Sequence, residues 1–360
     1  MATQQPSLFG ADEFEALGSL LLPEKSDPRT SPHVLVASVS GGRDSTALIL
    51  HLSDHGVVFE GLHMDTGWEA QETVDYIHGP LSDLVLAHTG RPLRIVQRDF
   101  RLTPDQEAAA ERVEAVLGQG KSGMVRLTLK KGMFPARTIR FCTQELKIFP
   151  ARDYYRSLTA EDESVIPVNA QGIRANESIA RSKYPVWDPY DGDCAIWRPL
   201  LRWTGEDVAE IHRRHGIEMN PLYAAGASRV GCWPCIFARK SEIANIADTD
   251  PRRIKAMRLL EAEVGHAAAL RAEAKGKAVD NPPGFFQSLY STRKPGEKHE
   301  GTCWPIDKAV AWSRTKTRKD LEHFADGVQE GCGRLSACEL PVYEPPVRTL
   351  DMLFDDLEEA

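Results

Sequence analysis

A strand, a glycine-rich turn, a helix and a second strand follow one another within residues 33–64, and this order constrains the fold most. Residues 34–39 form a short, β-branched apolar run, which is typical of a strand buried on both faces of a parallel sheet. Residues 46–56 predict a helix, and residues 57–64 predict the second strand. Because parallel neighbours need such a crossover, the chain is expected to form an α/β sheet.

Later segments extend the same pattern. Residues 93–97 and 165–170 are further strand candidates. Residues 204–215 predict a helix with Thr204 as its N-cap and acidic side chains in its first turn. We therefore expect an α/β fold with a parallel sheet and helices on both faces.

Changes in amino-acid composition and periodicity along the chain suggest three regions. Residues 1–30 carry Pro, Ser and charge without a sustained period and are expected to form a flexible arm. Residues 31–242 hold the expected α/β domain. Residues 243–360 change to Ala, Glu, Arg and Lys at helical spacing and then to a Gly/Pro-interrupted tail, which predicts a mainly helical C-terminal appendage.

Composition narrows the class of protein. A chain of 360 residues that is 42% hydrophobic can bury a real core, and no long apolar run or signal-like N-terminus is visible, so we expect a cytoplasmic protein without a membrane span. The net charge of -8 argues against broad attraction to nucleic acid. Residues 126–140 and 252–258 could still form a local basic groove, with a solvated charged face as the alternative.

The glycine-rich turn is the first candidate site. Two adjacent glycines allow backbone amides to close around phosphate oxygens, and the following helix favours negative charge at its N-terminus. The turn matches neither the Walker motif nor the dinucleotide fingerprint, and an ordinary connecting turn is the alternative. The candidate phosphate-binding residues are Ser40, Gly41, Gly42, Arg43, Asp44 and Ser45.

These six residues match SGGxDS, and the chain resembles the PP-loop ATP pyrophosphatases that carry this signature. The resemblance implies an adenine nucleotide alpha hydrolase-like fold and binding of ATP with magnesium. It further implies that the loop grips the pyrophosphate leaving group and that Asp44 lies near the magnesium ion.

Segments between about residues 33 and 240 resemble the phosphoadenylylsulfate (PAPS) reductase-like family. Asp65 begins a family-like Asp-Thr-Gly segment and could meet adenosine or metal, with a turn or cap role as the alternative. Lys147, in an R-x-C…K-x-x-P element, would offer a point charge to phosphate. Arg174, in a G-I-R-x-x-E-S element, would fork a phosphate, with a structural pairing to Glu177 as the alternative. The resemblance thus implies three catalytic residues: Asp44, Lys147 and Arg174.

Two departures separate the chain from the assimilatory reductases. Those reductases generally have a degraded phosphate loop, whereas this loop is intact, and the run at residues 337–340 is a poor match to their C-terminal Glu-Cys-Gly-Leu-His. The chain is similar instead to the DndC- and SspD-type sulfurtransferases of DNA phosphorothioation. That similarity implies an enzyme that adenylates an acceptor for sulfur transfer, with a cysteine desulfurase as sulfur donor and DNA as partner. A reductase of adenylylated sulfate and a non-catalytic nucleotide-binding subunit are the alternatives.

The cysteines suggest a metal site. Cys232 and Cys235 have the Cys-x-x-Cys spacing of zinc and iron–sulfur ligands. The resemblance supplies Cys142 as the third ligand, and Cys194 is the candidate for the fourth. All-thiolate ligation favours a 4Fe-4S cluster over catalytic zinc. The other three cysteines are expected to be free thiols, of which the last two could relay sulfur: Cys303, Cys332 and Cys338.

Overall fold

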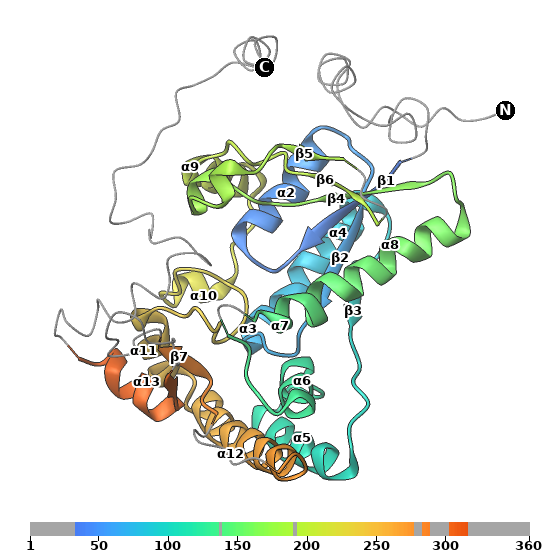
Figure 1. Ribbon diagram of the computed structural model, residues 1–360. Coiled ribbons are helices and arrows are strands. Elements are labelled where there is room, and N and C mark those ends of the chain that lie inside the picture. The colour runs from blue at the N-terminus through green and yellow to red at the C-terminus, as the bar shows by residue number, and fades with distance from the viewer. Residues whose placement is uncertain (1–32, 137–138, 190–192, 277–282, 289–301, 316–360) are drawn as a thin grey trace, which may run out of the picture.

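The computed structural model describes residues 33–136, 139–189, 193–276, 283–288 and 302–315, so the expected arm at residues 1–30 lies outside it. Its centre is a six-stranded sheet in the order β3-β2-β1-β4-β6-β5 (Figure 1). Every neighbouring pair is parallel except β5 and β6. The α/β class and the mostly parallel sheet are therefore confirmed. The strands are β1 (His33–Val39), β2 (Glu60–Asp65), β3 (Arg94–Gln97), β4 (Ile166–Ala170), β5 (Trp187–Asp188) and β6 (Ala195–Trp197).

The first crossover follows the prediction closely. Helix α2 (Arg43–Asp54) connects β1 to β2, and it begins three residues before the predicted start because the loop residues Arg43 to Ser45 already form its first turn. Helix α9 (Gly205–His215) is capped by Thr204, whose side chain accepts a hydrogen bond from the Asp207 amide. Strands β5 and β6 were not predicted, because runs of two and three residues are too short to show a period.

Helices cover both faces of the sheet, as expected (Figure 1). One apolar core joins the sheet to α2, α4 (Ser82–Thr89) and α9, and a smaller core joins the opposite face to α8 (Phe149–Glu161). Two helical stretches contain a π-helical turn. The first runs from α3 (Gln71–Tyr76) through Ile77–Leu81 into α4, and the second runs from α7 (Phe141–Thr143) through Gln144–Ile148 into α8.

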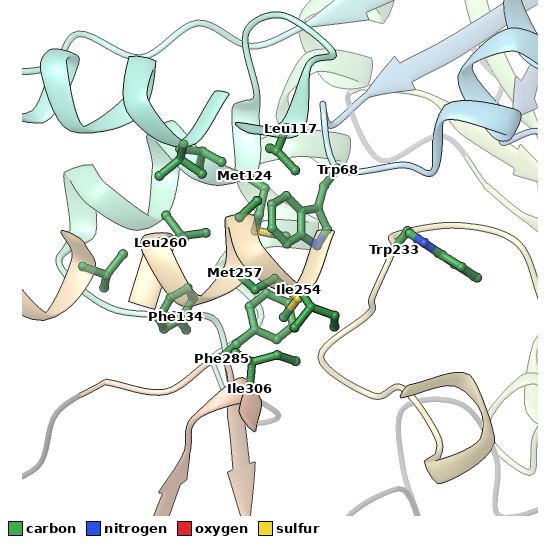
Figure 2. Packing of buried hydrophobic residues seen from close by; sticks show 14 of the residues in the cluster. Trp68, Leu117, Met124, Phe134, Trp233, Ile254, Met257, Leu260, Phe285 and Ile306 are labelled. Atoms are coloured by element: carbon green, nitrogen blue, oxygen red, sulfur yellow. The ribbon is translucent and has the colours of Figure 1, made fainter. Parts of the chain in front are cut away.

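A second core lies beside the sheet and is made by helices from distant parts of the chain. Figure 2 shows Trp68, Phe134, Met257, Leu260 and Phe285 packed together in it. Trp68 stacks on Phe285 with ring centroids 5.8 Å apart, and each such large apolar side chain stabilises the fold by about 1.5–3 kcal/mol on burial. The elements around this core are α5 (Pro104–Leu117), α6 (Gly123–Lys131), α11 (Lys240–Thr249), α12 (Pro251–Glu273), α13 (Ile306–Ser313), β7 (Phe286–Ser288) and β8 (Thr302–Trp304).

The second core includes residues from both sides of the domain boundary that the sequence predicted at residue 242. Helix α11 spans residue 242, α12 and α13 lie after it, and α5 and α6 lie before it, yet all of them share one buried cluster. The predicted boundary at residue 242 therefore does not coincide with a break between two cores. None of the helices in the described ranges combines the length and apolarity that a membrane span requires.

The strand order places the candidate site. Chain connections run from β1 outward through β2 and β3 on one side, and through β4 and β6 on the other. Such a reversal of direction is a topological switch point, and ligands of open α/β sheets bind in the crevice outside the carboxyl ends of the strands there. The loops that follow β1 and β4 therefore face one crevice. They carry the glycine-rich turn and Arg174.

Candidate functional site

The loop at residues 40–45 has the backbone geometry of an anion cradle. Gly41 has φ +73°, a conformation that L side chains rarely adopt, and a Cβ there would meet Ile77 at 3.0 Å. No side chain caps the N-terminus of α2 that follows. Its first amides and the helix dipole are therefore directed at the crevice, which suits a phosphate group.

The two serine hydroxyls brace the loop internally. Ser45 Oγ accepts a hydrogen bond from the Ser40 amide at 3.2 Å and donates one to the Gly42 carbonyl at 2.9 Å. Ser40 Oγ lies 3.1 Å from the Ser45 hydroxyl. Both serines thus hold the shape of the loop, so the donors left for phosphate are mainly backbone amides.

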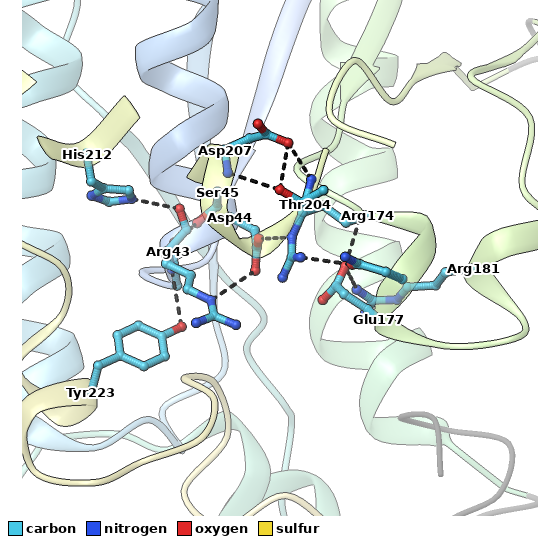
Figure 3. Close-up of polar contacts among 12 residues, drawn as sticks. Arg43, Asp44, Ser45, Arg174, Glu177, Arg181, Thr204, Asp207, His212 and Tyr223 are labelled. Atoms are coloured by element: carbon cyan, nitrogen blue, oxygen red, sulfur yellow. Dashed lines mark hydrogen bonds and ion pairs between the residues drawn. The ribbon is translucent and has the colours of Figure 1, made fainter. Parts of the chain in front are cut away.

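Two side chains of one segment beyond the sheet hold the loop from outside. Asn220 is 1% exposed, and its Nδ2 donates to the Gly41 carbonyl at 3.2 Å and to the Thr73 hydroxyl at 3.1 Å. Tyr223 Oη accepts a hydrogen bond from the Arg43 amide at 3.2 Å, as Figure 3 shows. Both residues belong to the Asn-Pro-Leu-Tyr run at α10 (Pro221–Ala224). That run therefore positions the loop.

His212 of α9 contributes a third support. Its Nε2 lies 3.0 Å from the Arg43 carbonyl and its Nδ1 lies 3.2 Å from the Ile217 carbonyl. The ring is 3% exposed and connects the start of α2 to the end of α9. The sequence does not reveal this role, because a lone histidine in an amphipathic helix carries no signal of its partner.

The loop after β4 brings Arg174 to the glycine-rich turn. Arg174 Nε donates to Asp44 Oδ1 at 2.5 Å, and its Nη1 donates to Asn176 Oδ1 at 2.8 Å (Figure 3). A Cβ at Gly172 would lie 2.5 Å from the Asp44 carbonyl oxygen, so only glycine permits this close approach. The side chain of Arg174 is 5% exposed. Two predicted catalytic residues, Asp44 and Arg174, are thus joined.

The alternative role of Arg174, a structural pairing with Glu177, is not what the side chain does. Glu177 accepts a hydrogen bond from the backbone amide of Arg174 at 2.8 Å, and its carboxylate pairs with Arg181. The short 3-10 turns here run over Ala175–Glu177 and Arg181–Lys183. The guanidinium of Arg174 is therefore directed to the loop, while Glu177 fixes the backbone that carries it.

Asp65 lies at the carboxyl end of β2, and its carboxylate has local partners. Its Oδ1 accepts a hydrogen bond from the Gly67 amide at 2.7 Å, and its Oδ2 accepts one from Gln97 at 3.3 Å. Burial raises the pKa of this carboxyl above its ordinary value, and the Gly67 hydrogen bond opposes that shift. Asp65 therefore has the turn role that the sequence offered as its alternative. It also lies at the carboxyl edge of the sheet, where a nucleotide contact is expected.

Lys147 has three thiols among its charged neighbours. The pKa of its ammonium is raised above the ordinary value, first by Cys232 and then by Glu69, against the effect of burial. Burial raises the pKa of the Cys232 thiol to about 12, and it also raises that of Cys142, with Cys235 as a further cause. Glu69 forms an antiparallel bridge with Cys232. We call Cys142, Cys232, Cys235 and Lys147 the thiol group.

The thiol group adjoins the phosphate loop. A Cβ at Gly42 would lie 3.6 Å from Tyr223 Oη and 3.9 Å from the Val230 carbonyl oxygen. Val230 precedes Cys232 by two residues, so the loop and the Cys-x-x-Cys turn share one wall of the crevice. The turn is held by hydrogen bonds from the Trp233 amide to the Trp68 carbonyl at 2.8 Å and from Trp68 Nε1 to the Pro234 carbonyl at 3.0 Å.

The predicted fourth ligand lies apart from the other three cysteines. Cys194 directly precedes β6, is 9% exposed and packs in the small core with Val36, Leu62 and Tyr155. Cys142 and Cys232 instead pack against the large helical core. Within the described ranges, no group of three or more His, Cys, Asp or Glu side chains is arranged to hold a metal ion. Within the described residues, Cys194 therefore does not complete a four-thiolate set with the other three cysteines, and Cys332 and Cys338 lie outside those residues.

The predicted basic groove also needs correction. Arg126 is 3% exposed and pairs with Glu114 and Glu107, each at 2.8 Å. Arg253 is 2% exposed and lies 4.9 Å from the centre of the Trp68 ring. Both arginines are internal and cannot line a groove. Within residues 126–136, Lys130 and Lys131 at the end of α6 remain accessible.

Comparisons with known proteins agree with these observations. Residues 120–238 match the family described as the phosphoadenosine phosphosulfate reductase domain. An uncharacterized 37.8 kDa protein of Escherichia phage 186 is 35% identical over 292 residues, which is 74% of this chain and 82% of that protein.

The relatives whose names state an activity match this chain with lower sequence identity or over fewer residues than the phage protein does. An adenosine 5'-phosphosulfate reductase of Mesorhizobium japonicum is 24% identical over 56% of this chain and 66% of its own length. The corresponding reductase of Streptomyces coelicolor is 41% identical over 68 residues, which is 18% of this chain and 28% of that protein. A solved PAPS reductase of Candida auris is 16% identical, covers 62% of this chain and 96% of its own, and has a TM-score of 0.39. By the family match, residues 120–238 of this chain belong to the PAPS reductase-like family.

Proposed function

We propose that this protein is an ATP pyrophosphatase that adenylates an acceptor, which then receives sulfur. The observation that carries the proposal is the intact loop at residues 40–45, whose amides face the crevice and whose Asp44 is joined to Arg174. A family member that binds an already activated nucleotide has no need of this cradle. The intact cradle supports splitting of ATP into AMP and pyrophosphate.

The residues of the loop suit the leaving group. In the proposed step an acceptor oxygen attacks the α-phosphorus of ATP and the bond to the bridging oxygen breaks, so pyrophosphate leaves. Amides at the start of α2 would bind its oxygens, and preorganised donors of this kind act where negative charge develops. Magnesium, when bound with ATP, supplies positive charge to the phosphates, and Asp44 is the carboxylate placed to hold it.

Arg174 is suited to the reacting phosphate. Its Nε and Nη1 are bound to Asp44 and Asn176, while Nη2 has no hydrogen-bond partner among the described residues. The two bonds fix the plane of the guanidinium, so Nη2 is presented in a defined direction. A planar fork held in this way stabilises a phosphate in the transition state with little loss of side-chain freedom.

The thiol group supplies the candidate sulfur chemistry. We propose that one of its cysteines receives sulfur as a persulfide from a donor such as a cysteine desulfurase, and that the outer sulfur then displaces AMP from the acceptor. A second thiol of the group would attack the resulting S–S bond, which releases the sulfur-bearing acceptor and leaves a disulfide between the two cysteines. Lys147 would hold the transferred sulfur in its anionic, nucleophilic form. Its position among the thiols supports this role, and the phosphate contact that the sequence suggested stays a prediction.

A patch of cations beside β3 supports a nucleic acid as acceptor. Arg98 lies 4.9 Å from the centre of the Phe149 ring, Arg152 lies 4.5 Å from the same ring, and Lys130 lies 5.8 Å from the Phe100 ring. Arg98 follows the carboxyl end of β3, so the patch flanks the crevice. Such a surface would bind phosphodiesters without reading sequence. DNA is the acceptor that we propose.

The test is the nucleotide product. Purified protein incubated with magnesium and α-labelled ATP should release pyrophosphate, with the labelled AMP either free or attached to the acceptor. Release of ADP and orthophosphate would overturn the proposal. Sulfite production from adenylylsulfate with a thiol reductant, without ATP cleavage, would identify a reductase. Tight ATP binding without any product would identify a nucleotide-binding subunit.

A further inference from the structure

A second cavity lies behind the Cys-x-x-Cys turn, where α3, α5, α10, α11 and α12 meet. Its volume is about 240 Å³, below the range of roughly 300–1,000 Å³ that is typical of sites for drug-sized ligands. Trp233, which stands between the two cysteines, lines it. The cavity is thus the size of a small metabolite and is separate from the phosphate loop.

Charges of both signs line this cavity. Arg252 is exposed at the start of α12 and makes no hydrogen bond or ion pair among the described residues. Glu72, near the start of α3, is likewise exposed and without such a partner there. Asp250 is already engaged, because its carboxylate accepts a hydrogen bond from the Arg253 amide at 2.9 Å. One cation and one carboxylate are therefore free to meet a ligand.

Arg253 provides an independent sign that this cavity suits a polar ligand. Its Nη2 donates to the Glu69 carbonyl at 2.7 Å and to Gln119 Oε1 at 2.9 Å, and its Nε lies 3.7 Å from Asp250 Oδ2. Its Nη1 has no partner, although the residue is only 2% exposed and lines the cavity. A buried donor without a partner costs free energy, which an anionic ligand group would recover.

We propose that this cavity binds a small zwitterion, namely an α-amino acid with a compact apolar side chain. Its carboxylate would bind Arg252 and Arg253, and its ammonium would bind Glu72. Leu117, Leu222 and Trp233 form the apolar part of the lining, against which the side chain would pack. A simple anion fits less well, because Glu72 and Asp250 would repel it.

Calorimetric titration of the full chain tests this site. L-alanine, L-cysteine and L-valine are the probes, and acetate, methylamine and sulfate each carry only one of the two charges. At least one of the three amino acids should bind ten or more times more tightly than any single-charge probe. Absence of binding by all three overturns the proposal, as does equal binding of acetate or sulfate, which would make this an anion site.

Variants assign the binding to this cavity. Arg252→Ala and Glu72→Gln remove exposed, unpaired groups, so both proteins should fold, and each should weaken amino-acid binding at least tenfold. Lys255→Ala is the matched control, because it removes an exposed cation from the same helix outside the cavity. Binding that survives Arg252→Ala, or that falls equally in Lys255→Ala, would contradict the proposed site. Pyrophosphate release is not part of this readout, so the two proposals can fail separately.

Discussion

The two halves of the candidate site are built in different ways. The phosphate loop is one run of six residues, and side chains from α9, α10 and the β4 loop hold it by direct hydrogen bonds. The thiol group instead consists of residues from separate segments, namely Cys142, Lys147 and the Cys232 turn. Its members influence one another through burial and charge. The first half is a fixed cradle, whereas the second is a low-polarity wall whose charge depends on Lys147. Variants of the two halves should therefore behave differently in one assay, the rate of pyrophosphate release.

The largest effect is expected for Asp44→Asn. Loss of this carboxylate removes the proposed magnesium ligand and the partner of Arg174, so pyrophosphate release should fall about a hundredfold or more. Steady-state release under saturating magnesium-ATP is the measurement. Asp54→Asn, at the far end of the same helix, is the control and should retain the wild-type rate. Activity that survives Asp44→Asn would remove the basis for treating the loop as the catalytic half.

Arg174→Lys should lower the rate by about tenfold to a hundredfold, because an ammonium cannot replace two directed charged hydrogen bonds. The same assay, with folding checked by circular dichroism, measures it. Arg181→Lys is the control, since that arginine pairs with Glu177 away from the loop. Near-normal kinetics in Arg174→Lys would return this residue to a structural role.

Tyr223→Phe should cause a smaller loss of about fivefold, since one neutral hydrogen bond to the Arg43 amide contributes about 1 kcal/mol. Its effect should fall on kcat more than on KM if the tyrosine positions the loop in the transition state. Tyr184→Phe, which alters an exposed tyrosine, is the control. A change in KM alone would mean that Tyr223 supports binding uniformly and not the reacting geometry.

Cys232→Ser should leave pyrophosphate release nearly unchanged and remove sulfur loading. The measurement is radiolabelled persulfide on the protein after incubation with a cysteine desulfurase and labelled cysteine. Cys194→Ser should keep both properties, because that thiol packs in a different core. Equal loss of labelling in the two variants would contradict the separation of Cys194 from the thiol group, and loss of pyrophosphate release in Cys232→Ser would show that the two halves are coupled.

Glu261→Gln should leave pyrophosphate release unchanged and alter only stability. Burial raises the pKa of Glu261 from 4.5 to about 7, although its carboxylate accepts hydrogen bonds from the Phe285 and Ile306 amides. The folded chain therefore holds a proton that the unfolded chain releases, so this contribution is complete below about pH 4.5 and is lost as the pH rises through about 7. Thermal unfolding between pH 5 and 8 should show a steeper fall in the wild type than in Glu261→Gln. Equal slopes would contradict the prediction.

The sequence predicted those parts of the site that are local. The run from β1 through the loop to α2 is contiguous, so its apolar strand, paired glycines and helix could be recognised together. Arg174 was placed near phosphate through its motif, but its partner Asp44 is 130 residues away. Nothing in the local pattern indicated that the two side chains meet.

Tertiary packing decided the rest. Cys194 looked equivalent to the other thiols because spacing alone does not show which core a cysteine joins, and β6 carries it away from Cys142. Arg126 and Arg253 read as surface charges because the sequence does not show that Glu114 and Trp68 cover them. Lys147 gains Cys232 and Cys235 as charged neighbours for the same reason, and its phosphate contact stays a prediction. Short-range pattern fixes which elements form, whereas the neighbours of a side chain depend on contacts that close only when distant segments pack.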